Sequence, residues 1–151
     1  IQPGITTGEL DRIAEEYIRD HGGVPTSKGY RGFPAATCIS PNAMVVHGIP
    51  GGHRVEEGDL ISVDVGITLD GLVADSAYTY AVGDVDDESA RLLEAGKQAL
   101  EAGIAQLADN VDGKFARRHE FRGIAAGTWH VIIPISLPHR ERAIPIRDAY
   151  A

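Results

Sequence analysis

Two aspartates, Asp64 and Asp75, have the residue type and spacing that most clearly indicate chemistry. They lie within residues 60–82, where apolar and polar residues alternate, a turn dipeptide Asp70-Gly71 follows, and a second extended run begins. A two-residue turn at Asp70-Gly71 sets Asp75 opposite Gly66. The two aspartates then become diagonal neighbours on one face of a β-hairpin, with backbones about 7–8 Å apart. We also expect open space beside Gly66.

Carboxylates in such an arrangement indicate a bound cation. Two carboxylates about 5 Å apart repel by about 3 kcal/mol at an effective dielectric near 20. Divalent metals turn this repulsion into binding, and a pair of bridged ions activates a shared water and polarises a carbonyl. Oxygen ligands with a histidine favour Mn, Fe, Co or Zn. The alternative is that both aspartates are solvated on the wet face of the hairpin.

Four other residues are candidates only as a group. His47 precedes a Gly-Ile-Pro turn and is either a catalytic residue or a surface histidine. Tyr30 and Phe33 lie in a glycine-hinged loop, where aromatic side chains often line a pocket. Cys38 is a candidate pocket residue or a small buried core residue.

A helix and two short strands are predicted before the hairpin. Thr6 and Glu9 form a capping box ahead of apolar residues at helical spacing, which predicts a helix over residues 7–20, closed by Gly22-Gly23. Residues 37–40 and 44–47 have the pattern of short strands. After the hairpin, Asp86 or Asp87 begins a second helix of about 20 residues.

Composition excludes several classes of function. The chain has 151 residues, 43% of them apolar, and a net charge of −8. These values suit one soluble domain and offer no basic surface for nucleic acid or anionic membranes. A single cysteine rules out an internal disulfide, and the longest apolar stretch, residues 131–137, is too short to span a bilayer. We therefore expect a cytoplasmic protein, and the absence of an initiator Met suggests a piece of a longer one.

The character of the sequence changes near Ala108. Residues 1–108 carry a net charge of −10 and residues 109–151 a net charge of +2, and clear periodicity stops at the same place. We predict a poorly structured tail over residues 109–151. A reading-frame error or a gene fusion is our hypothesis for its origin.

Three segments together resemble the type I methionine aminopeptidases, which are cobalt- or manganese-dependent enzymes that remove initiator methionine. The segments are KGYRGFPAATCISPN (28–42), VVHGIPG (45–51) and GDLISVDVGITLDGLVADSAYTY (58–80). The resemblance covers residues 1–108 and implies an α+β pita-bread fold of two pseudo-symmetric halves with metals between them. It identifies this chain as the first half, with an antiparallel hairpin and two covering helices.

The resemblance also implies residue roles. Asp64 matches a bidentate metal ligand and Asp75 a bridging ligand of two divalent ions, Co, Mn, Fe or Zn. His47 matches the histidine that contacts the substrate at the scissile peptide and stabilises the tetrahedral intermediate. Tyr30, Phe33 and Cys38 match the walls of the pocket for the methionine side chain. The implied partner is a peptide or nascent chain that begins with Met, and the implied state of the complete enzyme is a monomer.

Some parts of the family pattern are missing. The family has a later histidine in a G-H-G-[IV]-G segment and two later glutamates, one of which serves as general base. No matching segment surrounds the tail's candidates, which are His119, Glu120, His130, His139 and Glu141. We therefore expect this chain to bind metal weakly and to be inactive alone. Ser27 also replaces a frequent cysteine, and Val73-Ala74 replaces the usual His-Gly before Asp75.

Two alternatives remain open at this point. One is a catalytically dead pita-bread half that binds peptides. The other is a proline-directed relative, of the prolidase or aminopeptidase P type.

Overall fold

The computed structural model describes residues 1–109, with side chains through Ala102. Its centre is an antiparallel hairpin of β3 (Leu60–Leu69) and β4 (Leu72–Ala81). The turn residues Asp70 and Gly71 have positive φ values of 50° and 78°, as a two-residue hairpin turn requires. The ladder pairs Leu69 with Leu72 and continues without a break to Leu60 opposite Ala81. The predicted register is confirmed at every position.

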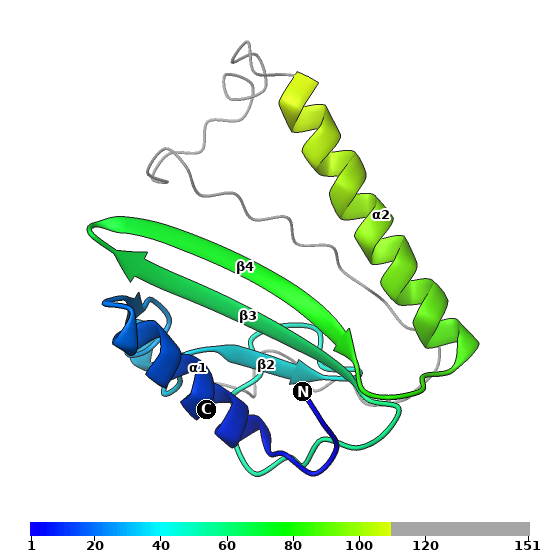
Figure 1. Cartoon of the computed structure of the whole chain (residues 1–151), viewed down its shortest axis with the longest axis horizontal. Coiled ribbons are helices and arrows are strands. Elements are labelled where there is room, and N and C mark those ends of the chain that lie inside the picture. Colours follow the sequence, from blue (N-terminus) through cyan, green and yellow to red (C-terminus); the bar gives the residue numbers. More distant parts are fainter. Residues whose placement is uncertain (110–151) are drawn as a thin grey trace.

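Two shorter strands complete the sheet of the described residues. Because β4 occupies one edge of β3 along its whole length, both short strands pair on the other edge. There β2 (Cys38–Pro41) pairs antiparallel with residues 61–64, and β1 (Val24–Pro25) with residues 67–68. The central strand β3 is thus held from both sides, while β4 lies at the edge (Figure 1).

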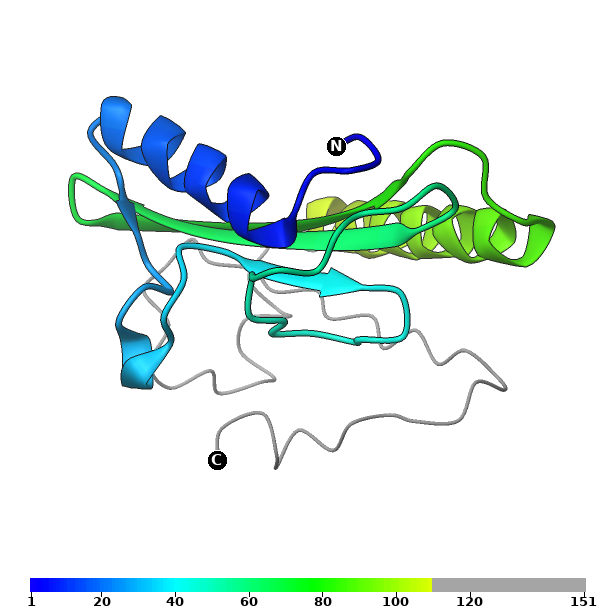
Figure 2. The same cartoon turned by 90° about the horizontal axis from the view of Figure 1, so that it is seen from below.

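Helix α1 (Thr7–Asp20) covers one face of the sheet, as Figure 2 shows from below. The Thr6 hydroxyl accepts a hydrogen bond from the Glu9 amide, and the Glu9 carboxylate accepts one from the Thr6 amide. The helix ends where Gly22, at φ 78°, turns the chain and the Gly23 amide donates to the Ile18 carbonyl at 2.9 Å. The predicted capping box and helix end are both confirmed.

The main core lies between α1 and the sheet. It consists of Ile39, Val55, Ile61 and Val82, with Ile5, Leu10 and Val63 packed against it. Leu10 comes from α1, whereas Ile61 and Val63 are alternate residues of β3, so they share one face of the sheet. The even-numbered residues of β3, Asp64 among them, therefore face away from α1.

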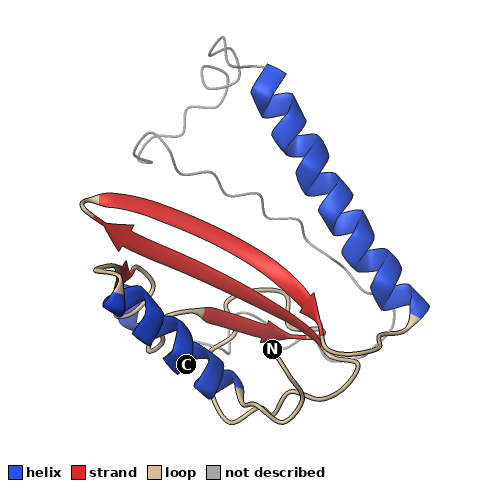
Figure 3. Ribbon diagram, in the orientation of Figure 1, coloured by secondary structure: helices blue, strands red, loops and turns tan. Residues whose placement is uncertain are grey.

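Helix α2 (Asp87–Asp109) begins where we predicted, since the Asp86 carboxylate accepts a hydrogen bond from the Ser89 amide at 2.7 Å. Two helices were expected to cover the sheet. Of the described elements only α1 does so, while α2 lies beyond β4 and to the side of the hairpin (Figures 1 and 3). No helix in the described region is both long and apolar enough to cross a membrane. The predicted tail, residues 109–151, falls outside the described residues except for Asp109 itself.

The second predicted strand, residues 44–47, is wrong. This segment returns beside β2 as a loop, and its contact with β2 includes a hydrogen bond from the Ile39 amide to the Gly48 carbonyl at 2.9 Å. His47 has a left-handed φ of 58°, which turns the backbone out of the extended conformation and prevents a ladder from forming.

Candidate active site

The hairpin places Asp64 and Asp75 on the sheet face that is remote from α1. Asp75 lies opposite Gly66 and Asp64 lies opposite Ala77, so the two aspartates are diagonal neighbours. Both side chains are half-buried. On the same face, the hydroxyls of Ser62 and Thr79 lie 2.6 Å apart, which independently confirms the alternation of the two strands. The predicted diagonal placement of the two aspartates is therefore confirmed.

The expected open space beside Gly66 is not present. Gly66 is buried, and a Cβ atom at this position would lie 3.3 Å from the Thr26 Cβ and 3.8 Å from the Ser27 Oγ. The Thr26 amide also donates to the Gly66 carbonyl at 2.9 Å. The segment after β1 thus packs over Gly66, the residue opposite Asp75, and it brings the Ser27 hydroxyl close to Gly66.

Cys38 connects the carboxylates to an apolar cluster. It pairs directly with Asp64 across β2 and β3, and it packs with Phe33 and Ala35 in a small buried core. Burial, and after it the negative charges of Asp64 and Asp75, raise the pKa of the Cys38 thiol to about 11. At neutral pH this side chain is therefore a neutral thiol, suited to an apolar wall and not to metal ligation as a thiolate.

Tyr30 lies apart from that cluster. It begins a short 3-10 turn, η1 (Tyr30–Gly32), and its side chain is 65% exposed. The Arg31 guanidinium carbon lies 5.5 Å from the centre of the Tyr30 ring. The structure thus brings Phe33 and Cys38 together and leaves Tyr30 at the surface of the loop.

His47 is exposed and lies on the far side of β2 from β3. Its position is set by the next residue, because the Gly48 carbonyl accepts the Ile39 amide hydrogen and the Gly48 amide donates to the Ser40 hydroxyl at 3.0 Å. Moving outward from β4, the order is therefore Asp75, Asp64, Cys38 and then the His47 loop.

One residue with a clear role was missed by the sequence analysis. The Asp11 carboxylate, on α1, accepts hydrogen bonds from the Thr37 amide at 2.7 Å, the Thr37 hydroxyl at 2.7 Å and the Ala36 amide at 3.4 Å. Nothing in the sequence around Asp11 signals this contact, because its partners lie 25 and 26 residues away.

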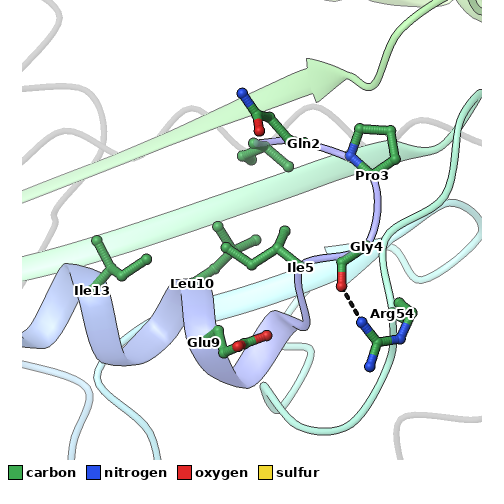
Figure 4. A pocket seen from close by; sticks show the side chains of 9 residues that line it. Gln2, Pro3, Gly4, Ile5, Glu9, Leu10, Ile13 and Arg54 are labelled. Atoms are coloured by element: carbon green, nitrogen blue, oxygen red, sulfur yellow. Dashed lines mark hydrogen bonds between the residues drawn. The ribbon is translucent and has the colours of Figure 1, made fainter.

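A cavity of about 640 Å³ lies elsewhere (Figure 4). The N-terminal residues 1–5, Arg54 and one side of α1 form its walls, and the Arg54 guanidinium donates to the Gly4 carbonyl. Leu10 and Ile13 of its lining come from α1, so this cavity and the carboxylate pair belong to opposite faces of the sheet.

The donor set of the carboxylate pair suits a divalent cation in its chemistry, since both groups are oxygen ligands on one face. In the region that the structure describes, no three side chains of His, Cys, Asp or Glu gather into a group that could hold a metal ion.

Comparison with known proteins gives consistent results. The model of metallopeptidase family M24 matches residues 1–119. Methionine aminopeptidase 1 of Bacillus subtilis is 46% identical over 106 residues, which is 70% of this chain and 43% of the relative. The matched region extends past Ala108, where the sequence changes character.

Solved structures agree in fold. The methionine aminopeptidase of Rickettsia prowazekii matches with a TM-score of 0.67 and 36% identity, covering 69% of this chain and 42% of that one. The enzyme of Thermotoga maritima matches with a TM-score of 0.65 and 40% identity, covering 68% and 41%. An X-Pro aminopeptidase of Thermotoga maritima is more distant, with a TM-score of 0.51 and 26% identity over 66% of this chain and 28% of that one. The chain thus spans about two fifths of the length of the methionine aminopeptidases that it matches.

Proposed function

Because the chain belongs to metallopeptidase family M24, we propose that it forms the N-terminal half of a methionine aminopeptidase that removes initiator methionine from nascent chains. The observation that carries the proposal is the placement of Asp64 and Asp75 on one face of the hairpin, with Cys38 directly opposite Asp64. This arrangement places two carboxylates of the kind that bind metals next to an apolar cluster, and that cluster suits the thioether of a methionine side chain.

The two aspartates are the metal ligands of the proposal. The family implies a divalent metal, and we assign Asp64 and Asp75 as the residues of this chain that would hold it, with Co, Mn, Fe or Zn as the candidate ions. Bound divalent ions would supply Lewis-acid polarisation of a carbonyl and a water of lowered pKa. The remaining ligands and the general base come from outside residues 1–109.

The other assigned residues bind and orient the substrate. Phe33 and Cys38 form the buried part of the pocket wall for the methionine side chain, and Tyr30 is the exposed rim of the same pocket. His47 donates a hydrogen bond at the scissile peptide and stabilises the tetrahedral intermediate. A peptide that begins with Met therefore enters over β2, between the His47 loop and the carboxylate pair.

A second candidate function applies to the chain taken alone. Among the side chains that the structure describes, which end at Ala102, no three metal-type residues form a group, so the isolated chain would act as a peptide-binding half without catalysis. We propose that residues 109–151 add no ligand, and that the complete enzyme is a cytoplasmic monomer that does not engage nucleic acid or membranes.

The test is cleavage of a Met-Ala-Ser peptide by the full-length gene product loaded with Mn²⁺ or Co²⁺. We expect release of methionine, and a fall in kcat/KM of at least about 100-fold in Asp75→Asn. The matched control is Asp70→Asn, a nearby carboxylate that lies in the exposed hairpin turn. Full activity of Asp75→Asn would refute the assignment.

The same assay separates the proline-directed alternative. A panel that includes Ala-Pro and Met-Pro dipeptides should be cleaved poorly relative to Met-Ala-Ser. Preference for X-Pro bonds would overturn the proposed substrate and retain the metallopeptidase family.

A further inference from the structure

We infer that Asp11 is a positioning residue for the substrate pocket, acting through Thr37 from the opposite side of the sheet. The inference rests on the proposed function, since the pocket wall is formed by Phe33 and Cys38. It assigns a role to a carboxylate that neither binds metal in the proposal nor contacts the substrate.

The Asp11 carboxylate holds two successive backbone amides. It accepts the Thr37 amide at 2.7 Å and the Ala36 amide at 3.4 Å, while the Thr37 hydroxyl adds a third hydrogen bond at 2.7 Å. Ala36 and Thr37 are fully buried. Three donors on one carboxylate in a buried segment form a specific anchor, because hydrogen bonds to charged groups are stronger than neutral ones.

The anchored segment lies between the two parts of the pocket wall. Phe33 and Ala35 precede it and Cys38 follows it, and these three residues pack together. The segment also leads directly into β2, whose first residue, Cys38, pairs with Asp64. A shift at Thr37 would therefore move the apolar wall relative to the carboxylate pair.

The anchor and the site lie on opposite faces of the sheet. Asp11 follows Leu10 in α1, and Leu10 packs against the core that contains Ile39. Cys38 and Ile39 are neighbours in β2, so their side chains point to opposite faces. Asp11 consequently cannot contact substrate bound near Cys38, so it positions the pocket wall through the backbone of residues 36–38. Its negative charge also raises the pKa of the Cys38 thiol directly, so Thr37→Val, which keeps that charge, is the decisive variant in the test.

The test uses the full-length gene product and two measurements. The first is the rate of alkylation of Cys38, followed by mass spectrometry of the peptide that contains it. We expect Asp11→Asn to raise this rate by about 10- to 100-fold. Thr37→Val should raise it by at least about threefold without changing charge, and Thr37→Ser, which keeps the hydroxyl, should stay near wild type.

Two controls make the result specific. Asp20→Asn changes an exposed carboxylate on the same helix and should have no effect. Leu10→Val weakens the core beside Asp11 without touching Thr37. The two variants Leu10→Val and Asp11→Asn are compared after their losses in free energy of unfolding have been shown to be equal. If Leu10→Val then raises the alkylation rate of Cys38 as much as Asp11→Asn does, Asp11 has only a structural role and the inference fails.

The second measurement is steady-state cleavage of Met-Ala-Ser by the same variants. Displacement of the pocket wall should raise KM at least about fivefold in Asp11→Asn and change kcat less, with Thr37→Ser retaining the wild-type KM. Unchanged KM and unchanged alkylation in Asp11→Asn would overturn the inference. A wild-type protein that cleaves no peptide would instead refute the proposed function, while the alkylation result would still decide the role of Asp11.

Discussion

Cys38 on β2 and Asp64 on β3 lie directly opposite each other in the sheet. Cys38 is only 7% exposed, so its thiol lies in a poorly solvated place, where the negative charge of Asp64 acts on it. Burial first, and then the charges of Asp64, Asp75 and Asp11, raise the thiol pKa from 9.0 to about 11. The Cys38 thiol therefore stays protonated well above neutral pH.

This shift predicts a pH dependence of stability. Between pH 9 and 11 the unfolded state releases the Cys38 proton and the folded state keeps it, so stability falls as the pH rises. The contribution is fully present below pH 9, and its loss through pH 11 is at most about 3 kcal/mol. Urea unfolding of metal-free wild type and Cys38→Ala across this range measures it. Parallel curves for the two proteins would contradict the prediction.

Metal affinity should depend on both aspartates of the hairpin. In the full-length gene product, Asp64→Asn and Asp75→Asn should each weaken Mn²⁺ binding at least about tenfold, because each removes a charged oxygen ligand. Asp70→Asn should bind like wild type. Isothermal titration calorimetry gives the three affinities. Equal affinities would show that the carboxylate pair is a solvated feature of the hairpin.

The 151-residue chain alone should bind Mn²⁺ at least about tenfold more weakly than the full-length product, because the proposed function takes only Asp64 and Asp75 as ligands from the described residues and a complete site needs more. The same calorimetric titration applies, with a circular dichroism spectrum to verify that the chain is folded. Equal affinity in the two proteins would place the missing ligands within these 151 residues.

The parts of the fold that were predicted from the sequence depend on neighbouring residues. Asp70-Gly71 determines the hairpin register, and with it the positions of Asp64 and Asp75, within a few residues of the turn. The capping box of Thr6 and Glu9 is equally local. All the residues that make up each of these two signals lie within a few positions of one another in the sequence. This explains why both predictions were correct.

The parts that were not predicted depend on contacts distant in the sequence. Thr26 packs over Gly66 because β1 pairs with the far end of β3. Asp11 reaches Thr37 because α1 crosses the sheet beside β2. The error at residues 44–47 has the same origin. The Gly48 amide donates to the Ser40 hydroxyl and the Ile39 amide donates to the Gly48 carbonyl, and these two hydrogen bonds override the strand pattern.

The two residues of the hairpin turn, Asp70 and Gly71, should differ strongly in how well they tolerate substitution. Gly71 has a φ of 78°, and Gly71→Ala should lower the free energy of unfolding by about 1 kcal/mol because an alanine is strained there. Asp70→Asn should be neutral, since asparagine adopts positive φ readily. Urea unfolding compares the two variants. An equal loss in both would mean that the turn does not control the register of Asp64 and Asp75.

The position of His47 should depend on the absence of a side chain at Gly48. A Cβ atom there would collide with the Ile39 carbonyl oxygen and the Met44 sulfur, and the backbone cannot retreat without breaking its hydrogen bonds to Ile39 and Ser40. We expect Gly48→Ala to cost about 2–3 kcal/mol of stability and to displace His47. Peptide cleavage should fall as well.

Gly51 provides the matched control for this substitution. It lies in the same loop, and a Cβ atom added to it meets nothing within 4 Å. Gly51→Ala should therefore stay within about 0.5 kcal/mol of wild type and keep its activity. Thermal or urea unfolding and cleavage of Met-Ala-Ser measure both variants. If Gly48→Ala behaves like Gly51→Ala in both assays, the close approach of Gly48 to β2 does not hold His47 in place.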